Sequence, residues 1–160
     1  MGTRHITAIK KDGQFKVSQY GQWDGYPIGQ WVILLSMLKE IDLSILKEKV
    51  DMVRKITETE LDAIPEKGLN EAYPWLSRDC WANIVKYIME DKLVLNIDTI
   101  DLEPNIWIEW SYLIDFDNNT LWVYRGTILS KDKKPNNPMH IYQLNSLPTL
   151  EEWKEKYKDM

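Results

Sequence analysis

Side chains able to bind an anion, a polar group or an aromatic ring are concentrated in the first thirty residues of the chain. They are Arg4, His5, Gln22, Trp23, Asp24, Tyr26 and Gln30. The planar guanidinium of arginine suits phosphate and carboxylate groups, and tryptophan and tyrosine combine a broad ring with one polar atom. This combination predicts a ligand-binding site, although it matches no established catalytic motif.

Arg4 and His5 are neighbours in a segment that we expect to be a strand. Successive strand side chains point to opposite faces, so the two residues cannot both line one flat face. Arg4 could bind an anionic group of a ligand, or it could form an ion pair with Asp24 or Glu109. The sequence leaves both alternatives open. Glu109 is the only charged residue in 106–114, and it lies on a solvated face, in an ion pair or in the same pocket as Arg4.

Catalytic and metal-binding roles for the histidines receive little support. His5 could act as a general base only beside a nucleophile, for which Thr3 and Thr7 are candidates, and neither belongs to a recognisable triad. His5 and His140 are the only two histidines, so a three-histidine metal centre is excluded. The single cysteine, Cys80, excludes an internal disulfide and a cysteine-built metal site. We therefore predict no metal, no cofactor and no assigned catalytic residue.

The loop 21–27 combines polar and aromatic residues with two glycines and a proline, just before a predicted helix. Free N–H groups at a helix N-terminus can bind an anion, and here they would belong to Gly29 and Gln30. The alternative is a purely structural loop, in which Trp23 fills the core and Asp24 caps backbone amides. We favour the ligand-binding interpretation.

The elements that must position these residues follow from hydrophobic periodicity. Strands are predicted at 4–10 and 14–20, joined by the turn-forming Asp12-Gly13, and the alternation places Phe15, Val17 and Gln19 on one face. A second hairpin is predicted from strands at 106–116 and 121–125, with weaker alternation at 93–97. Residues 131–138 are predicted to be a surface loop. The pattern predicts an α+β fold: an antiparallel sheet built from the two hairpins, with a helical segment packed on one face, in a single domain spanning 1–160.

Helices are predicted in the middle of the chain and at its end. Apolar residues at helical spacing indicate a helix at about 29–41 and a second one starting near Asp42. Capping boxes open helices at Thr57 and Thr149. Ser77 is predicted to cap a helix that carries Trp81, Ile84, Val85 and Ile88, and that would place Arg78 and Asp79 in its first turn.

Composition limits the partners. The net charge of −5 argues against a long nucleic acid, which needs a basic surface. Residues 1–31 are the exception, with four basic and two acidic side chains, a net charge of +2 that permits a small anionic ligand. The polar, alternating first twenty residues do not match a signal peptide, and the longest apolar run is too short for a membrane span. We expect a cytoplasmic protein with no membrane partner, and the sequence leaves open whether it forms a homo-oligomer.

Several segments carry a resemblance to a known family. They are MGTRH at 1–5, FKVSQYGQWDGYP at 15–27, LSRD at 76–79, EWSYLIDFDNNT at 109–120 and VYRG at 123–126. The chain resembles a family of small proteins from phages, prophages and some fungi, whose members share the MGTRH start and the YGQWDGYP motif and have no established activity. The resemblance spans most of the chain. If the chain is phage-encoded, it implies that the protein acts in the host cytoplasm.

Two functions from different classes are compatible with these observations. The first is a non-catalytic binding protein that sequesters a small anionic, nucleotide-like ligand or blocks a host protein, as a host-defence antagonist would. The second is a hydrolase of small amides or esters that resembles N-terminal-nucleophile enzymes. The second needs Thr3 at the chain terminus, whereas removal of the initiator methionine leaves Gly2 there. We favour the binding protein.

Overall fold

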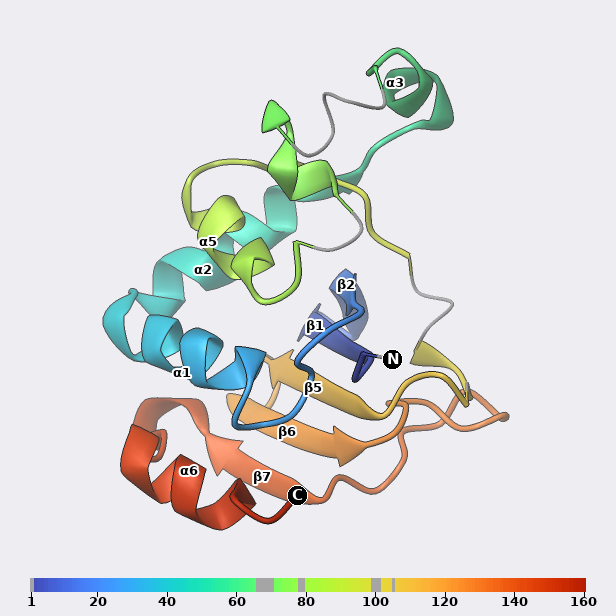
Figure 1. Ribbon diagram of the computed structural model, residues 1–160. Helices are drawn as coiled ribbons and strands as arrows, with labels where there is room; N and C mark the ends of the chain where they lie inside the picture. The colour runs from blue at the N-terminus through green and yellow to red at the C-terminus, as the bar shows by residue number, and fades with distance from the viewer. Residues whose placement is uncertain (1, 66–70, 78–79, 99–101, 105) are drawn as a thin grey trace.

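The computed structural model describes residues 2–65, 71–77, 80–98, 102–104 and 106–160. Its centre is a five-stranded sheet with the strand order β2-β1-β5-β6-β7 (Figure 1). The strands are β1 His5–Lys11, β2 Gln14–Gly21, β5 Trp110–Asp115, β6 Thr120–Arg125 and β7 His140–Gln143. The helices and the mainly antiparallel sheet confirm the α+β fold class.

One pairing differs from the expected antiparallel sheet: β1 and β5 run parallel, so the sheet is mixed. The physical reason is the helical segment between the two hairpins. It crosses one face and returns the chain to the sheet in its original direction, and parallel neighbours require such a long crossover. Both hairpins keep their antiparallel pairing.

The parallel pairing brings the turns of the two hairpins to the same end of the sheet. Asp12 and Gly13 both adopt positive φ, 54° and 71°, as a tight hairpin turn requires. Their N–H groups donate to the carboxylate of Asp117 in the second turn, over 2.7 and 2.9 Å. The N–H groups of Gly13 and Asp12 hold the pKa of Asp117 below its usual value. A side chain of one hairpin thus fixes the turn of the other.

A β-bulge changes which face of β2 carries its aromatic residue. Ile9 pairs with Val17 but Lys10 pairs with Phe15, which leaves Lys16 as the extra residue. Phe15 therefore packs on the opposite face from Val17. The prediction that Phe15 and Val17 share a face is wrong, because a bulge shifts the alternation by one residue.

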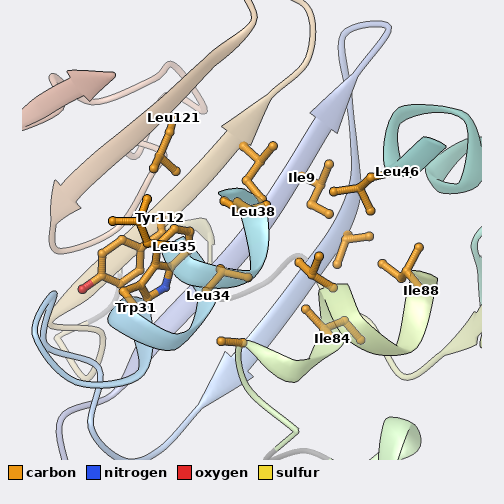
Figure 2. Close-up of a cluster of buried hydrophobic side chains, with 14 of the residues drawn as sticks. Ile9, Trp31, Leu34, Leu35, Leu38, Leu46, Ile84, Ile88, Tyr112 and Leu121 are labelled. Carbon is orange, nitrogen blue, oxygen red and sulfur yellow. The ribbon is translucent and has the colours of Figure 1, made fainter. Parts of the chain in front are cut away.

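Four helices pack on one face of the sheet, as predicted (Figures 1 and 2). They are α1 Gln30–Glu40, α2 Leu43–Lys49, α5 Asn83–Met89 and α6 Leu150–Tyr157. The apolar stripe of α1 is fully buried, and Trp31 stacks on Tyr112 of β5 with ring centroids 4.1 Å apart. Asp42 and Thr149 cap α2 and α6, and a capping box at Thr57 opens α3 Glu58–Asp62, which buries no side chain.

Shorter elements complete the described part of the chain. They are the 3₁₀ helices η1 Val50–Met52, η2 Pro74–Leu76 and η4 Leu144–Ser146, and the parallel strands β3 Arg54–Lys55 and β4 Val94–Leu95. In the predicted segment 93–97, only Val94 and Leu95 form a strand. The strand β7 was not predicted, because only four residues separate the preceding loop from η4.

Two predicted boundaries are wrong. The helix expected from Ser77 begins only at Asn83, because Trp81 adopts the left-handed φ of 55° that an α-helix cannot contain. Arg78 and Asp79 lie outside the described residues. The strand expected from Ile106 begins only at Trp110, and Ile108 instead packs on the second face of the sheet with Ile6 and Leu113. Among the helices that the structure describes, none has the length and apolar character to cross a membrane.

Candidate functional site

A cavity of about 330 Å³ lies beside the N-terminal end of β1. Its lining includes Arg4, Tyr26, Trp107 and Glu109, together with Thr3 and Ile106, and we call it the Arg4 pocket. Three residues predicted from the sequence therefore meet at one concave surface, although they come from three separate segments. Gly2 completes the lining at the chain start.

The position of Arg4 is fixed by backbone and ring contacts. Its carbonyl oxygen accepts the N–H of Glu109 over 3.0 Å, which ties the start of β1 to the segment before β5. Its guanidinium carbon lies 5.3 Å from the centre of the Trp107 ring, a cation–π geometry. Neither Asp24 nor Glu109 forms an ion pair with Arg4, so the described carboxylates leave its charge available to a ligand.

His5 is the first residue of β1, and unlike Arg4 it does not line the Arg4 pocket. Its side chain is completely buried against two glycines of the loop. A Cβ on Gly21 would stand 2.3 Å from the imidazole Cε1, and one on Gly25 would stand 2.7 Å from Nδ1. These contacts explain why the sequence places glycines there: the loop closes flat over the imidazole, and a side chain at either position would collide with it.

The buried imidazole is chemically isolated. Neither ring nitrogen has a hydrogen-bond partner among the described residues, so His5 has no hydroxyl within reach to activate. Burial lowers its pKa from 6.5 to about 4, against smaller opposing effects of the Thr3 backbone and the Asp24 charge. His5 is therefore neutral at physiological pH. This placement supports a packing role for His5, and it does not support one as a ligand contact or a general base.

The loop that follows β2 is anchored from inside the protein. The Tyr112 hydroxyl donates to the Gly25 carbonyl over 2.6 Å, and the Trp153 indole N–H donates to the Pro27 carbonyl over 2.6 Å. The Gly25 N–H donates to the Thr3 carbonyl over 3.1 Å, which joins the loop to the chain start. These bonds hold the backbone while the Tyr26 side chain projects outward.

Trp23 does not fill the core, so the structural alternative for this residue is wrong: 46% of its surface is exposed, against 43% for Tyr26. A Cβ on Gly2 would lie 2.4 Å from the Trp23 ring, so the chain start lies against that ring. Trp23 therefore borders the Arg4 pocket through Gly2 without lining it. Asp24 is exposed, and the half-buried Gln22 also lies outside the lining.

The start of α1 differs from the expected anion site. The Gly29 N–H donates to the Tyr26 carbonyl over 2.9 Å, and the Gln30 N–H donates to the Asp24 carbonyl over 2.8 Å. Both donors already have backbone acceptors, and Asp24, which accepts from Gln30, takes a positive φ of 54°. Gln30 is also absent from the lining of the Arg4 pocket. An anion in that pocket would be bound by Arg4.

Trp107 and Ile106 are the lining residues that sequence reasoning missed. Residues 106–116 were interpreted as one alternating strand, which assigns Trp107 to a solvated face without a role. A tryptophan at a polar position of such a pattern was the available signal, since an exposed tryptophan needs an explanation. In the structure, 58% of Trp107 and 89% of Ile106 are exposed.

Within the described ranges, no group of three or more histidine, cysteine, aspartate or glutamate side chains is placed to hold a metal ion. Comparisons of the chain with protein-family models, with curated proteins and with solved structures give no match. The functional argument therefore depends on the geometry of the Arg4 pocket.

Proposed function

We propose that the protein binds a small, anionic, ring-containing ligand such as a nucleotide in the Arg4 pocket and releases it unchanged. The observation that carries this proposal is Arg4 itself. Its guanidinium is positioned over Trp107, is not ion-paired with the nearby carboxylates, and lines a cavity bordered by exposed aromatic rings. An arginine without a carboxylate partner is suited to bind phosphate in a bidentate manner.

The size and lining of the pocket support a ligand of this class. Small-molecule pockets in proteins usually measure about 300–1,000 Å³, and the Arg4 pocket, at about 330 Å³, is at the small end of that range. Tyr26 and Trp107 offer ring surfaces on which a base can stack. The Glu109 carboxylate can accept a hydrogen bond from a base N–H or a sugar hydroxyl, which would orient a ligand whose phosphate binds Arg4.

Binding without turnover is supported by the environment of the two candidate catalytic residues. His5 is buried away from the pocket and has no hydroxyl partner. Thr3 lines the pocket, but two residues precede it. The hydrolase alternative therefore requires a mature chain that begins at Thr3. Intact mass spectrometry of the purified protein measures this directly.

The biological role that follows is sequestration of the ligand, in keeping with the resemblance to small phage proteins. A second role, the blocking of a host protein, is favoured by one observation. Arginine, tryptophan and tyrosine are enriched in protein interfaces, and Arg4 shares its pocket with the exposed rings of Tyr26 and Trp107. The two roles use the same surface and differ in the partner.

Isothermal titration calorimetry against the common nucleoside monophosphates tests the proposal, with a C-terminal tag so that the chain start remains native. Hydrogen bonds to a charged group contribute about 1.5–3 kcal/mol, and stacking of a base contributes about 1–3 kcal/mol. Arg4→Ala and Tyr26→Ala, which remove two side chains of the pocket lining, should each weaken binding by about tenfold to a hundredfold.

The matched control is Lys10→Ala. Lys10 is a cation at the other end of β1, its ammonium lies 5.8 Å from the centre of the Phe15 ring, and it does not line the pocket. Its replacement should leave the affinity unchanged. If no nucleotide gives heat with the wild-type protein, the nucleotide proposal is refuted. A protein partner that is lost on the same Arg4 and Tyr26 substitutions would then assign the surface to a protein interface.

A further inference from the structure

A second cavity, of about 520 Å³, adjoins the Arg4 pocket. Its lining includes Tyr124, Arg125, Gly126, Thr127, Lys131, Asn136 and Asn137. They come from the end of β6 and from the long loop that follows it. We call this cavity the Lys131 pocket.

The two pockets are joined at two points. Ile106 lines both of them, and 89% of its surface is exposed. The Gly126 N–H of the Lys131 pocket donates to the carbonyl of Glu109 in the Arg4 pocket over 2.9 Å. A ligand that occupies one pocket can therefore extend past Ile106 into the other.

The charges around this double site favour a ligand with two anionic groups. Arg125 and Lys131 make no ion pair among the described residues, and neither does Arg4. By contrast, Lys133, in the same loop as Lys131, is paired with Glu103 over 3.5 Å. The guanidinium carbon of Arg125 lies 4.7 Å from the centre of the Trp110 ring, on the helix-covered face of the sheet, so its charge is directed away from the Lys131 pocket. Among the described residues, the two pockets therefore present two cations without carboxylate partners, Arg4 and Lys131, against the single carboxylate of Glu109.

The Lys131 pocket also provides neutral polar contacts. The Asn136 amide already donates to the Thr127 carbonyl over 2.9 Å, which fixes the loop and leaves Asn137 as the amide for a ligand. Gly126 has a φ of 103°, and a Cβ placed on it would meet nothing within 4 Å. The backbone beside Gly126 is therefore open to close approach by a ligand group.

We propose that the preferred ligand is a dinucleotide, with its first nucleotide in the Arg4 pocket and its second phosphate and base in the Lys131 pocket. This inference rests on the proposed function and adds the second half of the ligand. Once the first nucleotide is bound, the second binds intramolecularly, and such linkage raises affinity by about a hundredfold to ten-thousandfold when the geometry permits both contacts.

The test compares adenosine 5′-monophosphate with the 5′-phosphorylated dinucleotide pApA by calorimetry, and likewise for the other three bases. At least one dinucleotide should bind about a hundredfold more tightly than its mononucleotide. Lys131→Ala and Asn137→Ala should each reduce dinucleotide affinity by about tenfold while leaving mononucleotide affinity unchanged. Lys134→Ala, in the same loop but outside both pockets, is the matched control and should change neither.

The outcomes separate this inference from the function on which it rests. If no mononucleotide and no dinucleotide binds, the proposed function fails and this inference fails with it. If mononucleotides bind in an Arg4-dependent manner but dinucleotides bind no more tightly, the proposed function stands and the second subsite is refuted. Tighter dinucleotide binding that is insensitive to both Lys131→Ala and Asn137→Ala also refutes the Lys131 pocket as that subsite.

Discussion

The buried imidazole of His5 makes the stability of this protein depend on pH between about 6.5 and 4. The folded protein binds a proton at His5 only near pH 4, whereas an unfolded chain does so near 6.5. Between these values the unfolded state carries the additional proton. The free energy of unfolding must therefore fall as the pH falls through this window, and it is at its full value above pH 6.5.

The magnitude follows from the two pKa values. One pKa unit corresponds to about 1.4 kcal/mol, so lowering the pKa from 6.5 to about 4 removes about 3 kcal/mol of stability by pH 4. This is a large fraction of the roughly 5–15 kcal/mol typical of a folded domain. The structural cause is the packing of the imidazole between Gly21 and Gly25 without a hydrogen-bond partner for either nitrogen.

The assay is urea unfolding followed by tryptophan fluorescence at half-unit steps from pH 7 to 4, for the wild type and for His5→Phe. The variant keeps a planar ring and cannot titrate, and it also removes the contact of the imidazole with the Thr3 backbone. The comparison removes the contribution of His140, whose pKa is also lowered, first by burial and then by the charge of Lys156. The difference in unfolding free energy between the two proteins should change by about 3 kcal/mol over the window.

A direct measurement on the wild-type protein avoids any effect of poor packing in the variant. The pKa of His5 can be followed in the wild type by NMR of the imidazole carbon-bound protons, and it should lie near 4. A measured pKa of 6 or above would refute the argument, because the imidazole would then be solvated or hydrogen-bonded. Parallel stability curves for the wild type and the variant would refute it independently.

Three further predictions use matched pairs. Gly25→Ala places a Cβ 2.7 Å from the Thr3 carbonyl oxygen and from His5, so it should lower the free energy of unfolding, measured by chemical denaturation, by about 1–3 kcal/mol. In Gly13→Ala the new Cβ has no atom within 4 Å, so its free energy of unfolding should fall only by the left-handed strain of about 1–2 kcal/mol. An unchanged stability of Gly25→Ala would contradict the packing argument. Tyr112→Phe removes the donor to the Gly25 carbonyl and should lower the free energy of unfolding by about 1–3 kcal/mol. Tyr124→Phe removes a buried hydroxyl without a partner in the described residues, so its free energy of unfolding should stay the same or rise. Equal losses of stability in the two variants would exclude the hydrogen bond as the cause. Nucleotide binding should weaken as salt rises from 50 to 500 mM because Arg4 contacts an exposed anionic group, and calorimetric affinities independent of salt would contradict an ionic contact.

The features that the sequence predicted correctly are determined within a few residues. The Asp12-Gly13 turn requires two successive positive φ angles, and these residue types tolerate them. The capping box at Thr57 satisfies backbone donors three residues away. The apolar spacing of α1 follows from the helical repeat, whatever the helix packs against. Local chemistry decides each of these.

The predictions from sequence fail where contacts between distant segments of the chain determine the structure. No local pattern specifies that β5 pairs with β1, so the parallel direction could not be predicted from either hairpin. The cap expected at Ser77 fails because Trp81 is left-handed in the folded chain. The alternation of 106–116 suggested a long strand, yet Ile108 lies over the second face of the sheet, where it packs with Ile6.

For the candidate site, the residue types in the YGQWDGYP segment suggested ligand contacts, and the structure separates two uses of that segment. Gly21 and Gly25 close the loop over His5, and the backbone carbonyls of Asp24, Gly25 and Pro27 accept hydrogen bonds from α1, β5 and α6. These residues are explained by packing. Sequence alone could not make that separation, because a glycine that avoids an imidazole and a glycine that admits a ligand are the same residue in the chain.

Some side chains at the candidate site have no packing role in the core, and these give the surface its chemistry. Trp23 and Tyr26 are presented by a loop whose backbone is hydrogen-bonded to the rest of the protein at Asp24, Gly25 and Pro27, and Arg4 is held over Trp107. Because this backbone is already held in place, little conformational entropy is lost when such side chains bind a ligand. The cation–π contact with Trp107 holds the guanidinium of Arg4 in place without neutralising its charge. We propose that a ligand contacts these side chains, and the calorimetric titrations test that proposal.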